Sequence, residues 1–396
     1  MRYMEKLLDG VEVEWKALGD ISNVYGGLTG KGKADFEDGN ALYISYKNIF
    51  DNIEVNFSKL EMVKVADSEN QHEVKYGDVL FTGSSETADE AGMSSAVTTI
   101  IKSSIYLNSF SFGLRFNDDI ELLPEFSKYL FRSHFMRLEI SKTASGVTRF
   151  NISKARFKKI LIPIPPLEVQ KEIVRILDTF AALTAELTAE LTARKKQYSY
   201  YRDQLFSFEE GEVEWKPLES LAENLDSIRK PVTGGLRETG NIPYYGASGI
   251  VDYVKDYIFD GDFLLVSEDG ANLIARNTPI AFSISGKNWV NNHAHVLKFK
   301  TYADRRFVEY YLNSIDLTPY ISGAAQPKLN QKNLNSIKIP NPSSEEKEKI
   351  VSILDKFDIL TTSISEGLPK EIEQRKKQYE YYRDMLLTFS KEKLES

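Results

Sequence analysis

Two polar loops carry the residue types best suited to chemistry in this 396-residue chain, and that chemistry is contact with nucleic acid. The loop from Ser145 to Lys154 has a glycine for a turn, an arginine suited to guanine or phosphate, and an asparagine suited to adenine. A similar loop runs from Ser322 to Asn330. One such loop is common in proteins, but its recurrence strengthens the prediction. The residues predicted to contact nucleic acid are Ser145, Gly146, Thr148, Arg149, Asn151 and Lys154 in the first loop, and Ser322, Gly323, Gln326, Lys328 and Asn330 in the second.

Each loop lies in a stretch without acidic residues, although the whole chain has a net charge of −8. Asp and Glu are absent between Glu139 and Glu168, and again between Asp316 and Glu345. Lysine and arginine in such windows create a local positive potential that attracts phosphates. A solvated basic loop without a ligand has the same composition, so this alternative stays open.

A glycine-rich segment, Gly27-Leu28-Thr29-Gly30-Lys31-Gly32-Lys33, approaches the pattern of a phosphate-binding loop. Ala34 stands where that loop needs a Ser or Thr for magnesium, so nucleotide binding is not predicted. The segment fits a contact loop better. The further predicted DNA contacts are Lys31 and Lys33 in this loop, and Asn272 and Arg276 later in the chain.

The sequence gives little sign of a catalytic centre. Cysteine is absent, which excludes a thiol nucleophile and Cys-ligated zinc. His293 and His295 alternate along a predicted strand, but two imidazoles without an evident third ligand favour ordinary hydrogen-bonded histidines over a metal site. No strand-linked glycine motif indicates an S-adenosylmethionine site, and no acidic cluster followed by lysine indicates a nuclease. We therefore expect no catalytic residue, metal or cofactor in this chain.

The elements that position the loops form an internal repeat. Val13-Glu14-Trp15-Lys16 returns as Val213-Glu214-Trp215-Lys216, an offset of 200. Ser145-Gly146 returns as Ser322-Gly323, an offset of 177, and the segment from Arg194 to Tyr198 returns at Arg375 with an offset of 181. The frame therefore repeats while the intervening cores differ. The predicted domains are 1–163 and 208–340, each followed by a helical segment, 164–207 and 341–396.

Both helical segments follow proline-rich breaks and place apolar side chains in steps of three and four, the pattern of a coiled coil. The tandem Thr-Ala-Glu-Leu at 184–191 adds a four-residue step to the first helix, and Gly367 and Pro369 predict a kink or restart in the second. A helix packed only on its own domain is the alternative. The predicted seam and partner-binding residues are Ile173, Leu177, Phe180, Leu187, Leu191, Tyr198 and Tyr201, with Ile350, Leu354, Phe357, Tyr379 and Tyr382.

The domain cores predict a mixed α/β structure, and with the helices an α+β fold with a pseudo-twofold repeat. Alternating apolar runs and turn signals predict strands and two late helices. The expected strands are 79–81, 95–101, 110–116, 263–266, 279–283 and 295–299, and the expected helices are 124–138 and 302–314.

The order of these features resembles the specificity subunit of type I restriction–modification systems, over the whole chain. The resemblance rests on the run from Ile162 to Gln170, the Thr-Ala-Glu-Leu tandem, both Ser-Gly loops, and the segments 268–272 and 289–293. It weakens after Pro342, where Ser-Ser-Glu-Glu-Lys replaces the earlier Leu-Glu-x-Gln pattern.

The resemblance implies a non-catalytic subunit in which each variable domain recognises half of a split double-stranded DNA target. It implies that the helices form an antiparallel coiled coil, set the gap between the halves and bind two methyltransferase subunits. Those subunits would bring S-adenosylmethionine, and a restriction–translocase subunit joined through them would use Mg²⁺ and ATP. A helix of about 40 residues spans about 60 Å, more than one turn of duplex.

Two other functions stay open on the sequence alone. One is a self-sufficient DNA-modifying enzyme, which the missing cofactor loop disfavours. The other is a coiled-coil scaffold with two protein-binding domains. The sequence shows no signal peptide and no apolar run of membrane-spanning length, so we expect a cytoplasmic protein.

Overall fold

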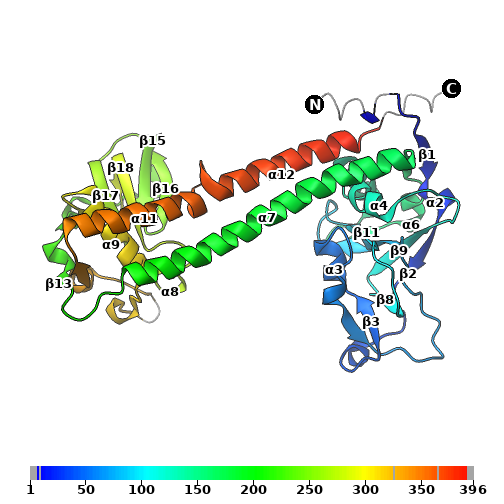
Figure 1. Cartoon of the computed structure of the whole chain (residues 1–396), viewed down its shortest axis with the longest axis horizontal. Helices are drawn as coiled ribbons and strands as arrows, with labels where there is room; N and C mark the ends of the chain where they lie inside the picture. The colour runs from blue at the N-terminus through cyan, green and yellow to red at the C-terminus, as the bar shows by residue number, and fades with distance from the viewer. Residues whose placement is uncertain (1–6, 9, 324–325, 364, 390–396) are drawn as a thin grey trace. The chain divides into compact units, whose positions relative to one another are not determined.

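The computed structural model describes residues 7–8, 10–323, 326–363 and 365–389. The chain divides into two compact units, one made of residues 1–186 and 372–396 and the other of residues 187–371. Each unit combines sheets with helices, which confirms the predicted α+β fold in two domains. Figure 1 colours the elements along the chain.

A four-stranded antiparallel sheet forms the centre of the first unit. Its strand β5 is buried along its whole length and carries the apolar run that an interior strand requires. Phe81 of β5 packs against the rings of Phe112, Phe131 and Phe157 at centroid distances of 5.3, 5.3 and 5.0 Å. In sheet order the strands are β2 (Ser22–Gly26), β9 (Ser111–Phe116), β5 (Val79–Thr82) and β7 (Ser94–Ala96).

The first unit also contains a second sheet of three strands and several short helices. The expected strand 95–101 ends at Ala96, and the expected helix 124–138 is two helices. Ser133 causes that division, because its hydroxyl accepts a hydrogen bond from the Met136 amide and starts a new helix. The sheet is β4 (Glu61–Val63), β3 (Ala41–Ile44) and β8 (Ile105–Leu107), and the helices are α2 (Leu18–Ile21), α3 (Tyr46–Asp51), α4 (Pro124–Leu130), α5 (His134–Ser141) and α6 (Lys154–Phe157).

A six-stranded sheet forms the centre of the second unit. The strand expected at 279–283 begins at Ala281 and continues to Val290, while the helix expected at 302–314 has those bounds. In sheet order the strands are β14 (Glu223–Asn224), β19 (Ala294–Lys298), β17 (Phe259–Ser267), β18 (Ala281–Val290), β15 (Thr239–Gly246) and β16 (Gly249–Val254). The helices are α8 (Asn272–Ala275), α9 (Tyr302–Ser314) and α10 (Gln331–Ser336).

A short antiparallel strand pair closes each unit with the same register. In the first unit β1 (Glu14–Ala17) pairs with β12 (Leu161–Ile164), so that Lys16 faces Ile162. In the second unit β13 (Glu214–Pro217) pairs with β20 (Lys338–Asn341), so that Lys216 faces Ile339. The repeated Val-Glu-Trp-Lys sequence therefore marks a structural frame that encloses each variable core.

Three helices make up the repeated helical segments: α7 (Leu167–Leu205), α11 (Ser344–Thr362) and α12 (Gly367–Leu386) (Figure 1). The predicted interruption of the second segment is confirmed, because α11 ends at Thr362 and α12 restarts at Gly367. Gly367 has a φ of +73°, and a Cβ atom there would lie 2.3 Å from the carbonyl oxygen of Ile359. A side chain at this position would therefore clash with the end of α11.

The predicted seam residues pack within each unit. In the first unit Ile173 and Leu177 are fully buried, and the ring of Phe180 stacks on Tyr382 at 5.2 Å. In the second unit the ring of Phe357 lies 6.1 Å from Tyr198 and 5.9 Å from Tyr201. The first part of α7 thus meets α12, and its later part meets α11. Of the remaining seam residues, Leu187, Ile350 and Leu354 are buried, and Leu191 and Tyr379 are partly buried.

None of the helices in the described ranges is long and apolar enough to cross a membrane.

Candidate nucleic-acid interface

The first predicted loop is an exposed hairpin that belongs to a separate three-stranded sheet of the first unit. Its strands β10 (Ala144–Ser145) and β11 (Phe150–Ile152) pair with each other, and β11 also pairs with β6 (Ser84–Ser85). Residues 146–149 form the tip, where Val147 is 92 % exposed. Binding residues are often carried on exposed loop tips that a rigid scaffold positions.

The second predicted loop has the same pairing pattern. Ser322 and Lys328 exchange backbone hydrogen bonds of 2.8 Å, and Lys328 also bridges to Asp269, just beyond the end of β17. In the first unit the corresponding pair is Ser145 with Asn151. Both members are shifted by the same 177 residues, so the repeat found in the sequence is also a repeat of three-dimensional structure. The tip residues 324–325 lie outside the described part.

A glycine makes each of these turns possible. Gly146 has a φ of +153°, and a Cβ atom there would lie 1.9 Å from the carbonyl oxygen of Arg149. Gly323 has a φ of +85°, and its Cβ atom would lie 2.4 Å from the carbonyl oxygen of Gln326. In both hairpins the carbonyl oxygen of the residue three positions after the glycine therefore lies where a Cβ atom of that position would be. The two glycines predicted as site residues act through the backbone and shape the tip.

Arg149 is exposed at the tip of the first hairpin, and its side chain is held from one side. Its Nε donates to Ser84 Oγ at 3.1 Å, and its guanidinium carbon lies 5.9 Å from the centre of the Phe110 ring. Asn151 is also exposed and donates a long bond of 3.4 Å to the Arg149 carbonyl. Of the other predicted residues in this hairpin, Ser145, Thr148 and Lys154 are exposed.

The second hairpin offers a different set of side chains. Gln326 is exposed, and Lys328 is 51 % exposed while its ammonium contacts Glu268 Oε1 at 3.0 Å. Asn330 caps α10, because its side-chain oxygen accepts a hydrogen bond from the Asn333 amide. Gln326 and Lys328 are thus placed to contact a ligand, whereas the Asn330 oxygen already serves the helix.

Three of the four further predicted contacts have partners inside their own unit, and Lys33 is exposed. The Lys31 side chain is only 4 % exposed and binds Glu69 at 2.5 Å, which holds the pKa of that carboxyl at about 2. Asn272 uses its amide on both backbone groups of Thr278. Arg276 donates to the Ile315 carbonyl, and burial lowers the pKa of its guanidinium. These side chains hold loops in place.

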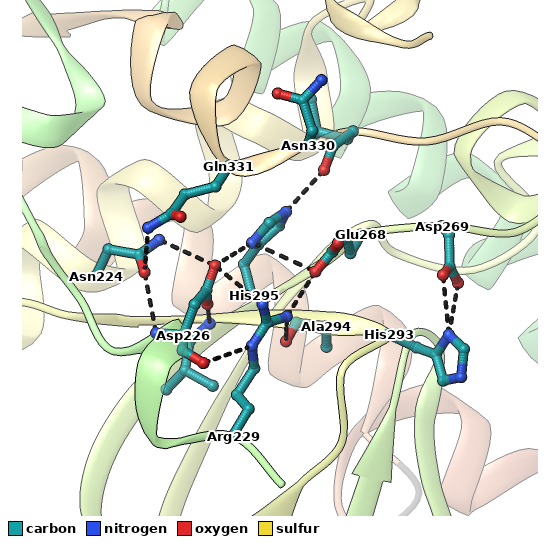
Figure 2. A network of polar contacts seen from close by, with 12 residues as sticks. Asn224, Asp226, Arg229, Glu268, Asp269, His293, Ala294, His295, Asn330 and Gln331 are labelled. Atoms are coloured by element: carbon teal, nitrogen blue, oxygen red, sulfur yellow. Dashed lines mark hydrogen bonds and ion pairs between the residues drawn. The ribbon is translucent and has the colours of Figure 1, made fainter. Parts of the chain in front are cut away.

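Beneath the second hairpin lies a buried polar network that sequence reasoning missed (Figure 2). His295 is fully buried, with Nδ1 2.5 Å from Asp226 Oδ2 and Nε2 2.7 Å from the Leu329 carbonyl oxygen. Both oxygens are hydrogen-bond acceptors, so each ring nitrogen of His295 faces an acceptor. Because Leu329 directly follows Lys328, this histidine fastens the base of the hairpin.

Charges in this network are compensated. Arg229 binds Glu268 at 2.6 Å and Asp226 at 3.3 Å, and Lys328 binds the other oxygen of Glu268. Burial alone would raise the pKa of both carboxyls, but these cations and His295 outweigh it and hold each pKa below its ordinary value. Two ionised carboxylates therefore face two permanent cations.

The same group has the composition of a metal site, since Asp226, Glu268 and His295 offer ligand atoms within 4.8 Å of one another. Arg229 and Lys328 already neutralise the carboxylates, and both nitrogens of His295 face oxygen acceptors. We therefore interpret the group as a structural network. His293, for which the sequence favoured an ordinary hydrogen-bonded histidine, directly precedes β19 and lies apart from His295 in Figure 2. It is 51 % exposed and contacts Asp269 at 2.9 Å.

One sequence signal could have found the network. His295 stands within Ala294-His295-Val296-Leu297, a run of otherwise buried apolar residues. A histidine on a buried strand needs hydrogen-bond partners. Those partners come from positions 69 residues earlier and 34 residues later, so spacing along the chain could not identify them.

Comparison with known proteins gives a consistent result over the whole chain. A family model described as the type I restriction modification DNA specificity domain matches twice, at residues 10–194 and 210–374. The EcoR124I/EcoR124II specificity subunit of Escherichia coli is 33 % identical over 99 % of this chain and 98 % of its own length. The EcoprrI specificity subunit of Escherichia coli is 33 % identical over 92 % of both chains.

Solved structures of low sequence identity share the fold. The S subunit of a type I restriction–modification system from M. genitalium superposes with a TM-score of 0.55 at 16 % identity, over 96 % of this chain and 98 % of that one. A chain from a structural study of complex assembly and conformational transition of a type I R-M system gives a TM-score of 0.64 at 15 % identity, over 96 % and 98 % of the two chains.

Proposed function

The chain belongs to the type I restriction–modification DNA specificity family, and we propose that it selects the DNA target of such a system. The single observation that carries this function is the repeated hairpin. The same backbone pairing and the same glycine turn occur once in each unit, and the exposed side chains beside the turn differ. A molecule that presents two related but unlike surfaces is suited to two unlike sequences.

Each unit would read one half of a bipartite target. The first hairpin presents Arg149 and Asn151, and the second presents Gln326 and Lys328. Arginine pairs well with guanine, while asparagine and glutamine pair well with adenine. The two hairpins present these side-chain types in opposite order along the chain, and the target is therefore expected to have two unlike halves.

The helical segments would set the gap between the halves and bind the partner subunits. Most residues of their apolar seam are buried or partly buried within the units, while the opposite side of α7 carries charged pairs such as Lys171–Glu168 in solvent. Exposed ion pairs of this kind contribute little to the stability of the folded protein, so this side of the helix is better suited to spacing the two halves than to packing in a core. Two methyltransferase subunits are the expected partners, and the restriction–translocase subunits would join through them.

We assign no reaction step and no cofactor to this chain. S-adenosylmethionine would belong to the methyltransferase subunits, and Mg²⁺ and ATP to the restriction subunit. The proposed place of action is the cytoplasm, where the target DNA of a bacterial restriction system is found.

The test is methylation mapping in cells that express the chain with its methyltransferase subunits. The expected result is one split motif. Arg149→Ala should relax the sequence requirement in one half only, and Lys328→Ala in the other. Lys195→Ala, in a helix and far in sequence from both hairpins, is the matched control for a lost positive charge. Methylation without any sequence preference, or none at all in the intact complex, would contradict the function.

A further inference from the structure

A cleft opens beside the first hairpin and has a volume of about 440 Å³. It lies wholly within the first unit. The lining residues are Tyr46, Phe50, Ser84, Ser85, Glu86, Glu90, Thr148 and Arg149. Two of these residues, Thr148 and Arg149, belong to the exposed hairpin tip, so the cleft is continuous with the surface that is proposed to face DNA.

One wall of the cleft carries a prepositioned hydrogen-bond donor. Arg149 is held through Nε by Ser84 and over its face by Phe110. Within the described ranges its two terminal nitrogens, Nη1 and Nη2, form no hydrogen bond or ion pair. A guanidinium held in this way loses little freedom on binding and presents two parallel N–H donors.

Another wall carries a prepositioned acceptor. Glu90 is partly buried, and one of its oxygens accepts a hydrogen bond from Ser85 Oγ at 3.2 Å. The loop around it is fixed by Arg137, whose guanidinium donates to the carbonyls of Asp89, Ala91 and Gly92. Burial of Arg137 lowers its pKa to about 10, which leaves it charged at neutral pH.

These charges decide which part of DNA the cleft can take. Glu86 and Glu90 would repel a phosphate, so the sugar–phosphate backbone is a poor ligand despite the arginine. A base edge fits better. Tyr46 and Phe50, stacked with centroids 5.9 Å apart and an interplanar angle of 17°, add an apolar wall that reduces competition from water.

We propose that this cleft reads a C·G base pair through the major groove. Arg149 donates to O6 and N7 of guanine, and Glu90 accepts from N4 of the paired cytosine. This pair alone presents two adjacent acceptors next to one donor, whereas an A·T pair places a donor between two acceptors. The inference rests on the proposed function, and it predicts at least one C·G pair in the half-site read by the first unit.

The test uses the chain assembled with its methyltransferase subunits and duplexes that carry the mapped target. Each guanine of the first half-site is replaced in turn by 7-deazaguanine, which lacks the N7 acceptor, and by inosine, which keeps O6 and N7. One 7-deazaguanine position should weaken binding by about 10-fold, and inosine at that position should change it less than about 2-fold.

The variants identify the side chains. Arg149→Ala should bind the unmodified duplex about 10- to 100-fold more weakly and should no longer distinguish 7-deazaguanine from guanine. Glu90→Ala should become insensitive to removal of the cytosine 4-amino group at the paired position. Lys159→Ala is the matched control, since Lys159 is exposed and does not line the cleft, and this variant should retain both sensitivities.

The outcomes separate this inference from the function on which it rests. A complex that binds every duplex equally would overturn the proposed function. A complex that is specific for its split target, but whose Arg149→Ala form still responds to 7-deazaguanine, would overturn the inference and leave the function standing. Equal melting temperatures for the variants and the unaltered chain establish that a loss of binding is not a loss of folding.

Discussion

Single glycines determine whether the two hairpins can form. At Gly146 an added Cβ atom would lie 1.9 Å from the Arg149 carbonyl oxygen, a backbone atom that a side-chain rotation cannot move. The same contact recurs at Gly323. The sequence identified these glycines as shared members of a repeated loop. It did not show why glycine is needed, which is that the carbonyl oxygen of the residue three positions later leaves no room for a Cβ atom.

Replacing Gly146 should therefore disable one hairpin. We expect Gly146→Ala to weaken binding to the first half-site at least about 10-fold, because the tip must open to relieve the clash and Arg149 moves with it. Binding to the second half-site should change little. Gly26→Ala is the control in the same unit, since Gly26 lacks a positive φ and its Cβ atom would meet nothing within 4 Å. Equal effects of the two substitutions would refute the argument.

His295 differs from these glycines, because its partners lie 69 and 34 positions away along the chain. His295→Ala would leave the buried Leu329 carbonyl without the His295 donor and remove one of several partners of Asp226, which keeps Arg229 and the Val296 amide. The expected cost is about 1–3 kcal/mol in the free energy of unfolding. Chemical denaturation of the full chain measures this change. His293→Ala, at an exposed position, should leave the unfolding midpoint nearly unchanged, and a similar loss there would indicate that burial is not the cause.

Other residues show why the candidate site could be predicted only in part. Arg149 and Lys328 are exposed where the loops predicted, whereas Lys31 and Arg276 bind groups of their own units. Each was selected for its charge. What distinguishes Lys31 and Arg276 is their partial burial against groups 38 or 39 positions away along the chain, and the local sequence does not show that burial.

At the scale of elements, the helices were the most predictable feature, because their periodicity is local. The break before Gly367 followed from one glycine and one proline. Strand ends were harder to predict. The strand expected to reach Ile101 stops at Ala96, where the chain leaves the sheet although its sequence continues with Val97-Thr98-Thr99-Ile100. Residues with strand propensity extend a strand only where a neighbour is available for pairing.

The length of α7 provides a prediction at this scale. Insertion of one further Thr-Ala-Glu-Leu unit after Leu191 adds about 6 Å of helix, more than one base-pair step of about 3.4 Å. We expect the preferred gap in the target to lengthen by one or two base pairs while both half-sites keep their sequence. Methylation mapping reads both quantities at once. Thr188→Ala, which changes this tandem without changing its length, should retain the original gap. A changed half-site with an unchanged gap would contradict the role of α7 in spacing.

At the scale of the whole molecule, what repeats is the frame and what varies is the core inside it. Lys16 faces Ile162 in one unit, and Lys216 faces Ile339 in the other, with neighbouring residues in the same register. The chain enters and leaves each variable core through this two-stranded frame. The cores between these frames contain the two main sheets and both hairpins, so each core carries its recognition surface with it.

Because the frames match, the cores should be exchangeable. In a chain in which residues 217–338 replace residues 17–161, the frame keeps its pairing. Residues 14–16 still face residues 162–164, and Pro217 still faces Lys338. Its target should contain the second half-site sequence twice, and the first half-site sequence should disappear. Methylation mapping of cells that express this chain with the methyltransferase subunits tests the expectation. The control is a chain into whose gene the segment for its own residues 17–161 has been reinserted in the same way. Retention of the original target would show that base recognition depends on residues outside the cores, and would place the specificity in the frame or the helices.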